Sequence, residues 1–299
     1  AEEQEGLAKK SPYVASLPWN HFARKNVGYL YAVSRGASLI FDVDDDNELK
    51  LVDGSGGRPV PSLILPSQET KLDMARPYDK RTLVFNPYPL MKSTSPEAWP
   101  RGFPYPAITD RASYEAARHP ESVPASNVGV WQSLADHDPD VDAVYRLTQR
   151  QLHFDFDEIR PIAIPRNVMV PYNAQATVHT APAYWGMVLP LSVPGRVSDI
   201  WRSYFTQRLL WDLGLHVAFT GAQVVQERTA HNFLADMDAE RDLYFKTPAL
   251  VKFLSSWDGA HLPSLPERIH ALYTDLYERD YIELEDVVAS KLWTAALEA

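Results

Sequence analysis

Four aspartates stand within five residues of this sequence, at Asp42, Asp44, Asp45 and Asp46. They come directly after the apolar stretch 38–41, which predicts a short buried strand that opens into a concentrated negative site. Carboxylates this close repel one another when all are ionised, so they are stable together only in bulk water or around a hard divalent cation. The five residues alone are equally compatible with a cation site and with an acidic loop.

Basic and amide side chains precede the aspartates on a predicted helix. Asn20 can cap this helix, whose apolar residues recur at helical spacing, and Gly36 is placed to end it. The first turns hold Arg24, Lys25 and Asn26. Cations near a helix N-terminus oppose the helix dipole, and a bound anion would relieve that repulsion. The alternative is that the two cations face water or pair with the aspartates.

The composition narrows the kinds of ligand and partner. The 299 residues are 45% apolar and 23% charged, which is typical of a globular protein with a large core. The formal charge of −10 argues against nonspecific binding to nucleic acid or to anionic lipid. Because the chain has no cysteine, any metal must be held by oxygen or imidazole. No run of 18 apolar residues occurs and the acidic start lacks a leader signature, so we expect a soluble chain that is a processed or excised piece.

A helix, a strand and acidic residues at the end of the strand form the layout of a nucleotide-binding α/β sheet. Ala-Arg-Lys-Asn-Val-Gly-Tyr-Leu-Tyr-Ala-Val (23–33) and the stretch 36–46 together resemble the GT-A glycosyltransferase-like domain of the STELLO family, Golgi proteins first described in plants. The resemblance runs from about residue 15 to about residue 258. It implies a GT-A-like mixed sheet flanked by helices, and a DXD motif in which aspartates hold Mn²⁺ or Mg²⁺ and the diphosphate of a sugar nucleotide.

The next part of the resemblance is a pair of short segments that each contain a proline. The pair Asn86-Pro87-Tyr88 and Trp99-Pro100-Arg101-Gly102 is similar to the family's motifs in type and separation. Arg101 is predicted to bind a phosphate or an acceptor hydroxyl, and Trp99 to stack on a sugar ring. Packing of Trp99 in the core is the alternative.

Two further motifs of the family are matched at 139–145 and 170–177. Asp142 is predicted to contact the acceptor, with helix capping as the alternative. Asn173, in a polar set between apolar segments, suits hydrogen bonding to a polyol. A turn whose side chains bond their own backbone is the competing interpretation.

The stretch 196–214 resembles a helix of the family closely. Ser198 is expected to cap the helix and Gly214 to end it. In an inverting glycosyl transfer a carboxylate accepts the proton of the acceptor hydroxyl, and we predict Asp199 as that base. Arg202 follows on the same face. The alternative for Asp199 is an ion pair with Arg202 or Arg196.

The predicted site combines these residues. Many GT-A enzymes complete the metal shell with a histidine after the DXD motif, so the predicted metal ligands are Asp44, Asp46 and His231. A plain surface histidine is the alternative for His231. The remaining contacts are predicted to come from Arg24, Lys25, Asn26, Asp44, Arg101 and Arg228 for the nucleotide sugar, and from Trp99, Asp142, Asn173 and Arg202 for the acceptor.

The expected function is transfer of a sugar from a nucleotide-diphosphate sugar, a UDP-sugar, to a hydroxyl of a glycan or glycoprotein in the Golgi lumen. We divide the chain into a GT-A-like domain at 1–258 and a helical C-terminal extension at 259–299. Only 41 residues precede Asp42, so the N-terminal strand of GT-A folds and the membrane anchor of the family are expected to lie outside this chain. If the missing strand impairs nucleotide binding, the alternatives are a catalytically silent scaffold of Golgi polysaccharide synthesis or a sugar-nucleotide mutase.

Overall fold

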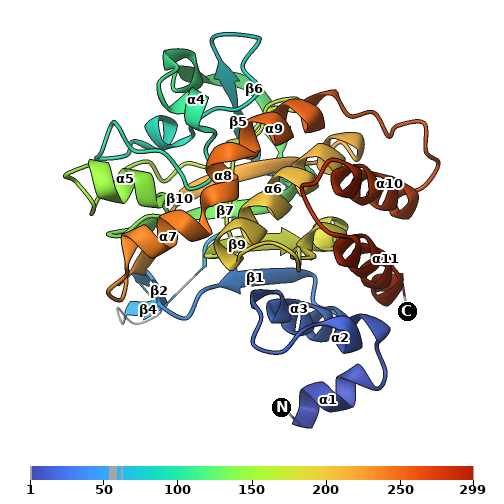
Figure 1. The fold of residues 1–299 in the computed structure, drawn as a ribbon. Helices are drawn as coiled ribbons and strands as arrows, with labels where there is room; N and C mark the ends of the chain where they lie inside the picture. The colour runs from blue at the N-terminus through green and yellow to red at the C-terminus, as the bar shows by residue number, and fades with distance from the viewer. Residues whose placement is uncertain (1, 54–58, 62, 299) are drawn as a thin grey trace.

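The computed structural model describes residues 2–53, 59–61 and 63–298, and in these ranges its centre is a mixed β-sheet (Figure 1). The described part of the sheet has eight strands in the order β1-β9-β7-β10-β8-β5-β6, with β2 paired to the end of β10. A separate hairpin joins β3 to β4. The strands are β1 (Leu39–Val43), β2 (Asn47–Leu49), β3 (Leu51–Asp53), β4 (Pro59–Pro61), β5 (Lys71–Pro77), β6 (Ala116–Pro124), β7 (Val128–Asp136), β8 (Ile162–Ala163), β9 (Ala176–Thr180) and β10 (His216–Gln226).

Alternate residues of the central strands face two different hydrophobic clusters, as a pleated strand requires. On β7, Val130 and Leu134 belong to the large cluster that also contains the helices, whereas Trp131 belongs to a smaller cluster on the opposite face. On β1, Ile40 faces the helices and Phe41 faces away from them. This alternation directs Asp42, two residues after Ile40, toward the helical layer.

The longer helices lie on one face and at one side of the sheet (Figure 1). The α-helices are α1 (Glu2–Ala8), α2 (Pro12–Ser16), α3 (Lys25–Ser34), α4 (Tyr105–Ile108), α5 (Ala143–Thr148), α6 (Gly195–Asp212), α7 (Phe233–Ala239), α8 (Arg241–Phe245), α9 (Thr247–Ser256), α10 (Leu265–Glu278) and α11 (Leu284–Glu298). Short 3-10 helices are η1 (Phe22–Arg24), η2 (Tyr88–Met91), η3 (Arg111–Ser113), η4 (Ala125–Asn127) and η5 (Ala181–Met187). No helix among the described residues has the length and apolar character needed to cross a membrane.

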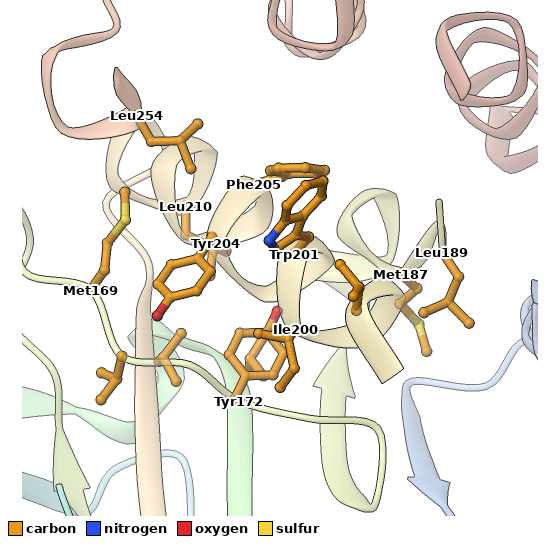
Figure 2. Packing of buried hydrophobic residues seen from close by; sticks show 14 of the residues in the cluster. Met169, Tyr172, Met187, Leu189, Ile200, Trp201, Tyr204, Phe205, Leu210 and Leu254 are labelled. Carbon is orange, nitrogen blue, oxygen red and sulfur yellow. The ribbon is translucent and has the colours of Figure 1, made fainter. Parts of the chain in front are cut away.

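The most buried helix is α6, which packs on every side (Figure 2). Ile200 lies near Tyr172 on the sheet side, whereas Trp201 and Phe205 point toward the C-terminal part of the chain. The Phe205 ring meets Tyr273 of α10 at 5.8 Å between ring centroids. Because aliphatic and aromatic groups surround it, any charged residue of α6 must be paired inside the protein.

The C-terminal helices are fastened to the segment that leads into α6. At the first turn of α11, Asp286 is buried and accepts the backbone N–H groups of Leu191 and Ser192 and the hydroxyl of Ser192. Trp293 of the same helix is fully buried, with its ring 5.2 Å from that of Tyr13. Helix α11 is therefore part of the support of α6 and of the N-terminal helices.

Several element predictions are confirmed. The strand expected at 38–41 is β1, which extends through Asp42 to Val43, β7 and β10 lie where strands were expected at 127–134 and 216–220, and the end of the chain is helical. Gly36 and Gly214 both have positive φ at the ends of their helices, at 76° and 70°. Within the described residues, no strand precedes β1.

Other element predictions are wrong. The glycines and prolines of 47–81 predict a long loop or a small excursion, but these residues form strands β2 to β5, with Gly54, Gly56 and Gly57 outside the described residues. Residues 82–85, predicted as a strand, make only one isolated bridge, between Val84 and Met169. Ser198 does not cap α6, because the helix begins at Gly195 and the Ser198 hydroxyl donates to the carbonyl of Pro190.

Candidate functional site

Three parallel strands deliver polar segments to one edge of the sheet. Strand β9 is antiparallel to both β1 and β7, and β7 is parallel to β10, so β1, β7 and β10 end at the same edge. The segments that follow them are 44–46, 137–142 and 227–232, and residues 173–175 lead into β9 there. Ligands of α/β sheets bind at such carboxyl ends. We call this edge, with Lys25, Asp44, Asp46 and Arg228, the acidic edge.

Asp42 is a buried anchor rather than an open ligand. Its side chain accepts the Tyr29 hydroxyl at 2.6 Å and lies 3.5 Å from the guanidinium of Arg202 and 2.8 Å from the Lys25 ammonium. Arg202 itself has no exposed surface. The predicted acceptor contact through Arg202 is therefore wrong for this conformation, because the side chain points into the core.

Asp44 lies beyond the end of β1 and is half-open to solvent. Lys25 connects it to the anchor, since the ammonium is 2.9 Å from Asp44 Oδ1 and donates to the carbonyl of Ala174 at 3.1 Å. Burial raises the pKa of Asp44 to about 6, with Lys25 acting in the opposite direction. Its side chain is still 39% exposed, so water moderates that shift. Burial acts to lower the pKa of Lys25, but Asp42 and Asp44 outweigh it and raise the value.

Asp46 is held at the same edge by amide side chains. It accepts Gln226 Nε2 at 2.9 Å and Asn47 Nδ2 at 3.0 Å. Arg228 donates to Gln226 Oε1 at 3.2 Å and lies 3.4 Å from Asp138. Burial lowers the pKa of Arg228 below its ordinary value. Lys25, at the start of α3, and Arg228, in the segment after β10, thus flank the two aspartates from different elements.

Behind the acidic edge is a saturated ionic network, which we call the Arg101 network. Arg101 makes paired hydrogen bonds to Asp140 at 2.8 and 3.0 Å and to Asp199 at 3.0 and 2.9 Å. Asn173 donates to Asp140 at 2.8 Å, and the N–H of Ala174 donates to Asp199 at 3.1 Å. Burial acts to raise the pKa of Asp140, but Arg101 outweighs it and lowers the value to about 2.

A glycine brings Arg101 to α6. Gly102 has a φ of 79°, and a Cβ atom there would lie 2.2 Å from a methyl carbon of Ile200. Only glycine combines this left-handed conformation with so close a contact. The turn of the Trp-Pro-Arg-Gly motif is therefore built to press Arg101 against the start of α6.

The Arg101 network corrects three predictions. Arg101 has its donors committed to Asp140, Asp199 and the carbonyl of Arg196, so none is left for a phosphate. Asn173 is 8% exposed and fully hydrogen-bonded, so it does not face a polyol. Asp199 is 3% exposed and paired with an arginine, as the alternative interpretation held, but the partner is Arg101. Its role as a base stays a prediction that requires this pair to open.

Trp99 and Asp142 form a buried pair. The indole N–H of Trp99, which is 5% exposed, donates to Asp142 at 2.7 Å, and Asp142 caps α5 by accepting the N–H of Tyr145 at 2.8 Å. Burial raises the pKa of Asp142 to about 7. The predicted sugar contacts of both residues are therefore replaced by packing and capping.

Two predicted nucleotide contacts near the start of α3 lie away from the acidic edge. Arg24 donates to Gln4 at 3.0 Å and stacks on Trp19 at 3.9 Å. Asn26 is fully buried and donates to the hydroxyl of Tyr13. Of the three consecutive polar residues 24–26, only Lys25 reaches the acidic edge.

The predicted metal triad is not assembled. His231 pairs with Asp236 at 3.1 Å, near the start of α7. Across the part of the chain that the structure describes, no three histidine, aspartate or glutamate side chains are grouped to hold a metal ion. A metal at Asp44 and Asp46 would need its other ligands from elsewhere.

Sequence reasoning missed the residues that organise the edge. Gln226, Asp140 and Tyr29 each contact a charged group that had been singled out. The available signal was position, since Gln226 is the last residue of its strand and Asp140 follows the end of another.

The acidic edge offers two accessible carboxylates beside two cations, a set suited to a cation together with an anionic, oxygen-rich ligand.

Known proteins resemble this chain over most of its length. Residues 196–299 match the family model of STELLO glycosyltransferases. In Arabidopsis thaliana, the protein named "Probable glycosyltransferase STELLO1" is 37% identical to the chain over 253 residues, and "Probable glycosyltransferase STELLO2" is 36% identical over 253 residues. Each alignment covers 81% of this chain and 31% of the relative, so the chain spans about a third of the length of these curated relatives.

Proposed function

This chain belongs to the STELLO glycosyltransferase family, and from this premise we propose that its acidic edge binds a nucleotide-diphosphate sugar and supports sugar transfer to an acceptor hydroxyl. A GT-A-type fold, a UDP-sugar donor, a glycan or glycoprotein acceptor and a place in the Golgi lumen belong to the same proposal. So does attachment to a membrane only through a segment outside this chain.

One observation carries the proposal. Asp44 contacts Lys25, and Asp46 is joined to Arg228 through Gln226, at the carboxyl ends of parallel strands, although these residues come from distant parts of the sequence. A diphosphate needs cations around its oxygens, and a divalent ion that joins it to the protein needs carboxylates. The acidic edge supplies both kinds of group in one place.

The residues present fit Mn²⁺ or Mg²⁺. Carboxylate oxygens are the ligands that these ions prefer, and Mg²⁺ is commonly bound by one or two carboxylates together with water and substrate phosphates. Lys25 lies within 3 Å of both Asp42 and Asp44, so the position already accommodates a positive charge. Asp44 and Asp46 would hold the metal. When bound, it would neutralise the charge that develops on the leaving diphosphate.

The chain's own groups would act around that leaving group. Lys25 and Arg228 would donate hydrogen bonds to phosphate oxygens, and Gln226 would keep the Asp46 carboxylate in place. The acceptor hydroxyl must lose a proton. Asp199 would serve as base only if Arg101 released it, because both of its oxygens are now engaged.

A second candidate is a catalytically silent protein that keeps the fold for partner binding. The observation in its favour is the saturation of the Arg101 network. The predicted base is paired, and Trp99, Asp142, Asn173 and Arg202, all predicted to contact the acceptor, are buried. This candidate predicts no donor binding at the acidic edge.

Thermal unfolding with ligands separates the two candidates. The wild type, Asp44→Ala and the exposed control Asp45→Ala would be measured with UDP, GDP and their sugar nucleotides, in Mn²⁺ or in EDTA. A ligand at about 100 times its dissociation constant stabilises the native state by about 2.7 kcal/mol. We expect a metal-dependent shift with one nucleotide that Asp44→Ala abolishes and Asp45→Ala keeps. No shift with any nucleotide would leave the silent protein as the better account.

A further inference from the structure

The Lys25 ammonium stands where a cation between two carboxylates would stand. It is 2.8 Å from Asp42 Oδ1, 2.9 Å from Asp44 Oδ1 and 3.1 Å from the carbonyl oxygen of Ala174. Two of these contacts are hydrogen bonds, to Asp44 and to Ala174, and the contact to Asp42 is an ion pair. Lys25 is thus held in the protein alone by three oxygen atoms, and one of its partners is a proposed metal ligand.

The two carboxylates hold Lys25 unequally. Asp42 is 1% exposed in its side chain and is fixed by Tyr29 and Arg202, so it cannot move. The side chain of Asp44 is 39% exposed, and Lys25 is its only side-chain partner in the described structure. If one of the two contacts opens, it is therefore the contact to Asp44, and Lys25 keeps Asp42 and Ala174.

The charges around Lys25 balance as they stand. Asp42 and Asp44 carry two negative charges, while Lys25 and Arg202 carry two positive charges. A divalent ion that entered alone between Asp44 and Asp46 would displace Lys25 from Asp44 and leave an excess of positive charge beside it, an arrangement that like-charge repulsion opposes. A diphosphate entering with the ion would restore the balance.

We propose that Lys25 is a built-in counter-ion that occupies the cation position at Asp44 until a divalent metal and a diphosphate enter together. The N–H that leaves Asp44 then donates to the diphosphate. The long, flexible lysine stem permits this exchange while Asp42 retains the ammonium. This inference rests on the proposed function. It adds how the metal and the diphosphate enter the site and what Lys25 does before they enter.

The exchange predicts strong coupling between the two ligands. Metal alone should bind weakly because it competes with Lys25, and metal should bind much more tightly with the diphosphate. By linkage the metal must raise diphosphate affinity by the same factor. Removing the lysine would raise metal affinity through lost repulsion even if the Lys25–Asp44 ion pair were purely structural, so the coupling between the two ligands is the quantity that distinguishes the exchange.

Calorimetric titration with Mn²⁺, pyrophosphate and both together tests this inference without assuming a nucleotide. The variants are Lys25→Met, Lys25→Arg, and Lys50→Met as the matched control, since Lys50 pairs with Asp136 near the end of the neighbouring strand. We expect Lys25→Met to bind Mn²⁺ alone about tenfold more tightly than the wild type and to lose most of the coupling, within the usual range of roughly 5- to 150-fold. Lys50→Met should behave as the wild type, and Lys25→Arg should keep the weak binding of Mn²⁺ alone because it retains the positive charge.

Equal binding of Mn²⁺ alone by the wild type and Lys25→Met would overturn the exchange and leave the proposed function standing. If no protein bound Mn²⁺ even with pyrophosphate, both the metal site and the exchange would be overturned. Should Lys25→Met fail to fold, the ¹⁵N signal of the Lys25 ammonium in the wild type decides the question. We expect it to shift with Mg²⁺ plus pyrophosphate and not with the same concentration of Mg²⁺ alone, and an unchanged signal with both would contradict the exchange.

Discussion

The acidic edge and the Arg101 network are neighbours with similar composition and opposite states. Both are built of aspartates, basic residues and amides. In the network, Asp199 is 4% exposed in its side chain and shares an arginine with a second carboxylate. At the edge, Asp44 is 39% exposed and has one lysine as its partner. The two regions differ in whether their charged groups are already fully paired within the protein.

This comparison separates structure from ligand binding within one polar region. Charged groups that satisfy one another inside a protein fix its conformation, because opening them exposes an unpaired charge. Groups that remain partly unpaired at a sheet edge are available to a ligand. Residue type alone does not distinguish the two. Variants that unpair the network should mainly lower the unfolding free energy, whereas variants that neutralise the edge should mainly weaken ligand binding.

The largest effect is expected from Arg101→Met. It would leave Asp140 and Asp199 buried without their cation, and breaking such a pair from one side costs about 3–5 kcal/mol of unfolding free energy. Urea unfolding measures the loss. Asp45→Asn, which changes an exposed aspartate of the acidic edge, should cost less than about 0.5 kcal/mol. Equal losses in the two variants would remove the distinction between network and edge.

The pH dependence of stability should reveal Asp142. A carboxyl whose pKa is higher in the folded state favours folding while it is protonated, and this contribution is lost as the pH rises from its unfolded value of 3.8 through about 7. Between pH 5 and pH 7 the wild type should lose about 2 kcal/mol relative to Asp142→Asn, which does not titrate. Denaturant unfolding at both pH values checks this. A pH-independent difference would show that Asp142 is ionised throughout.

Trp99→Phe should have a smaller effect. The ring stays in the core, but Asp142 loses the indole N–H, and an unsatisfied buried acceptor costs roughly 1–2 kcal/mol. The exposed Trp19 is the control, and Trp19→Phe should change stability by less than about 0.5 kcal/mol. Thermal or urea unfolding is the measurement. No loss in Trp99→Phe would return Trp99 to the candidates for ligand contact.

The smallest effect on stability is expected at the edge itself. Asp44→Asn removes one half-exposed ion pair, which is worth less than about 1 kcal/mol in either direction. The same variant should lose the metal-dependent shift with nucleotide. If it lost several kcal/mol instead, Asp44 would belong to the saturated network, and the contrast drawn above would fail.

The local pattern predicted much of the fold but little of the pairing. An apolar run before the aspartates was enough to place β1, and positive-φ glycines marked two helix ends correctly. Strand β5 was missed because its residues 71–77 alternate weakly and include charged and proline residues, while its partners in β6 lie 39 to 53 residues away in sequence. Long-range partners supply the stability that such strands lack locally.

The site predictions failed where a partner came from another element. Asp44, Asp46 and Arg228 lie at the edge because they follow strand ends, and Lys25 reaches it from the start of α3. Arg101 was correctly seen as an unusual, rigidly placed arginine, but its carboxylates are 39 and 98 residues away. Spacing along the chain carries no information about such contacts, so a saturated arginine and a free one look the same in sequence.

Asp286 gives the last helix a mechanical role in the acidic edge. By holding the backbone at Leu191 and Ser192, it fixes the approach to α6, the helix that carries Asp199 and Arg202. A chain trimmed before α11 would keep every polar side chain of the edge and lose the brace behind them. Proteolytic cleavage near residue 283 should therefore weaken ligand binding at the acidic edge, although it removes none of the side chains there.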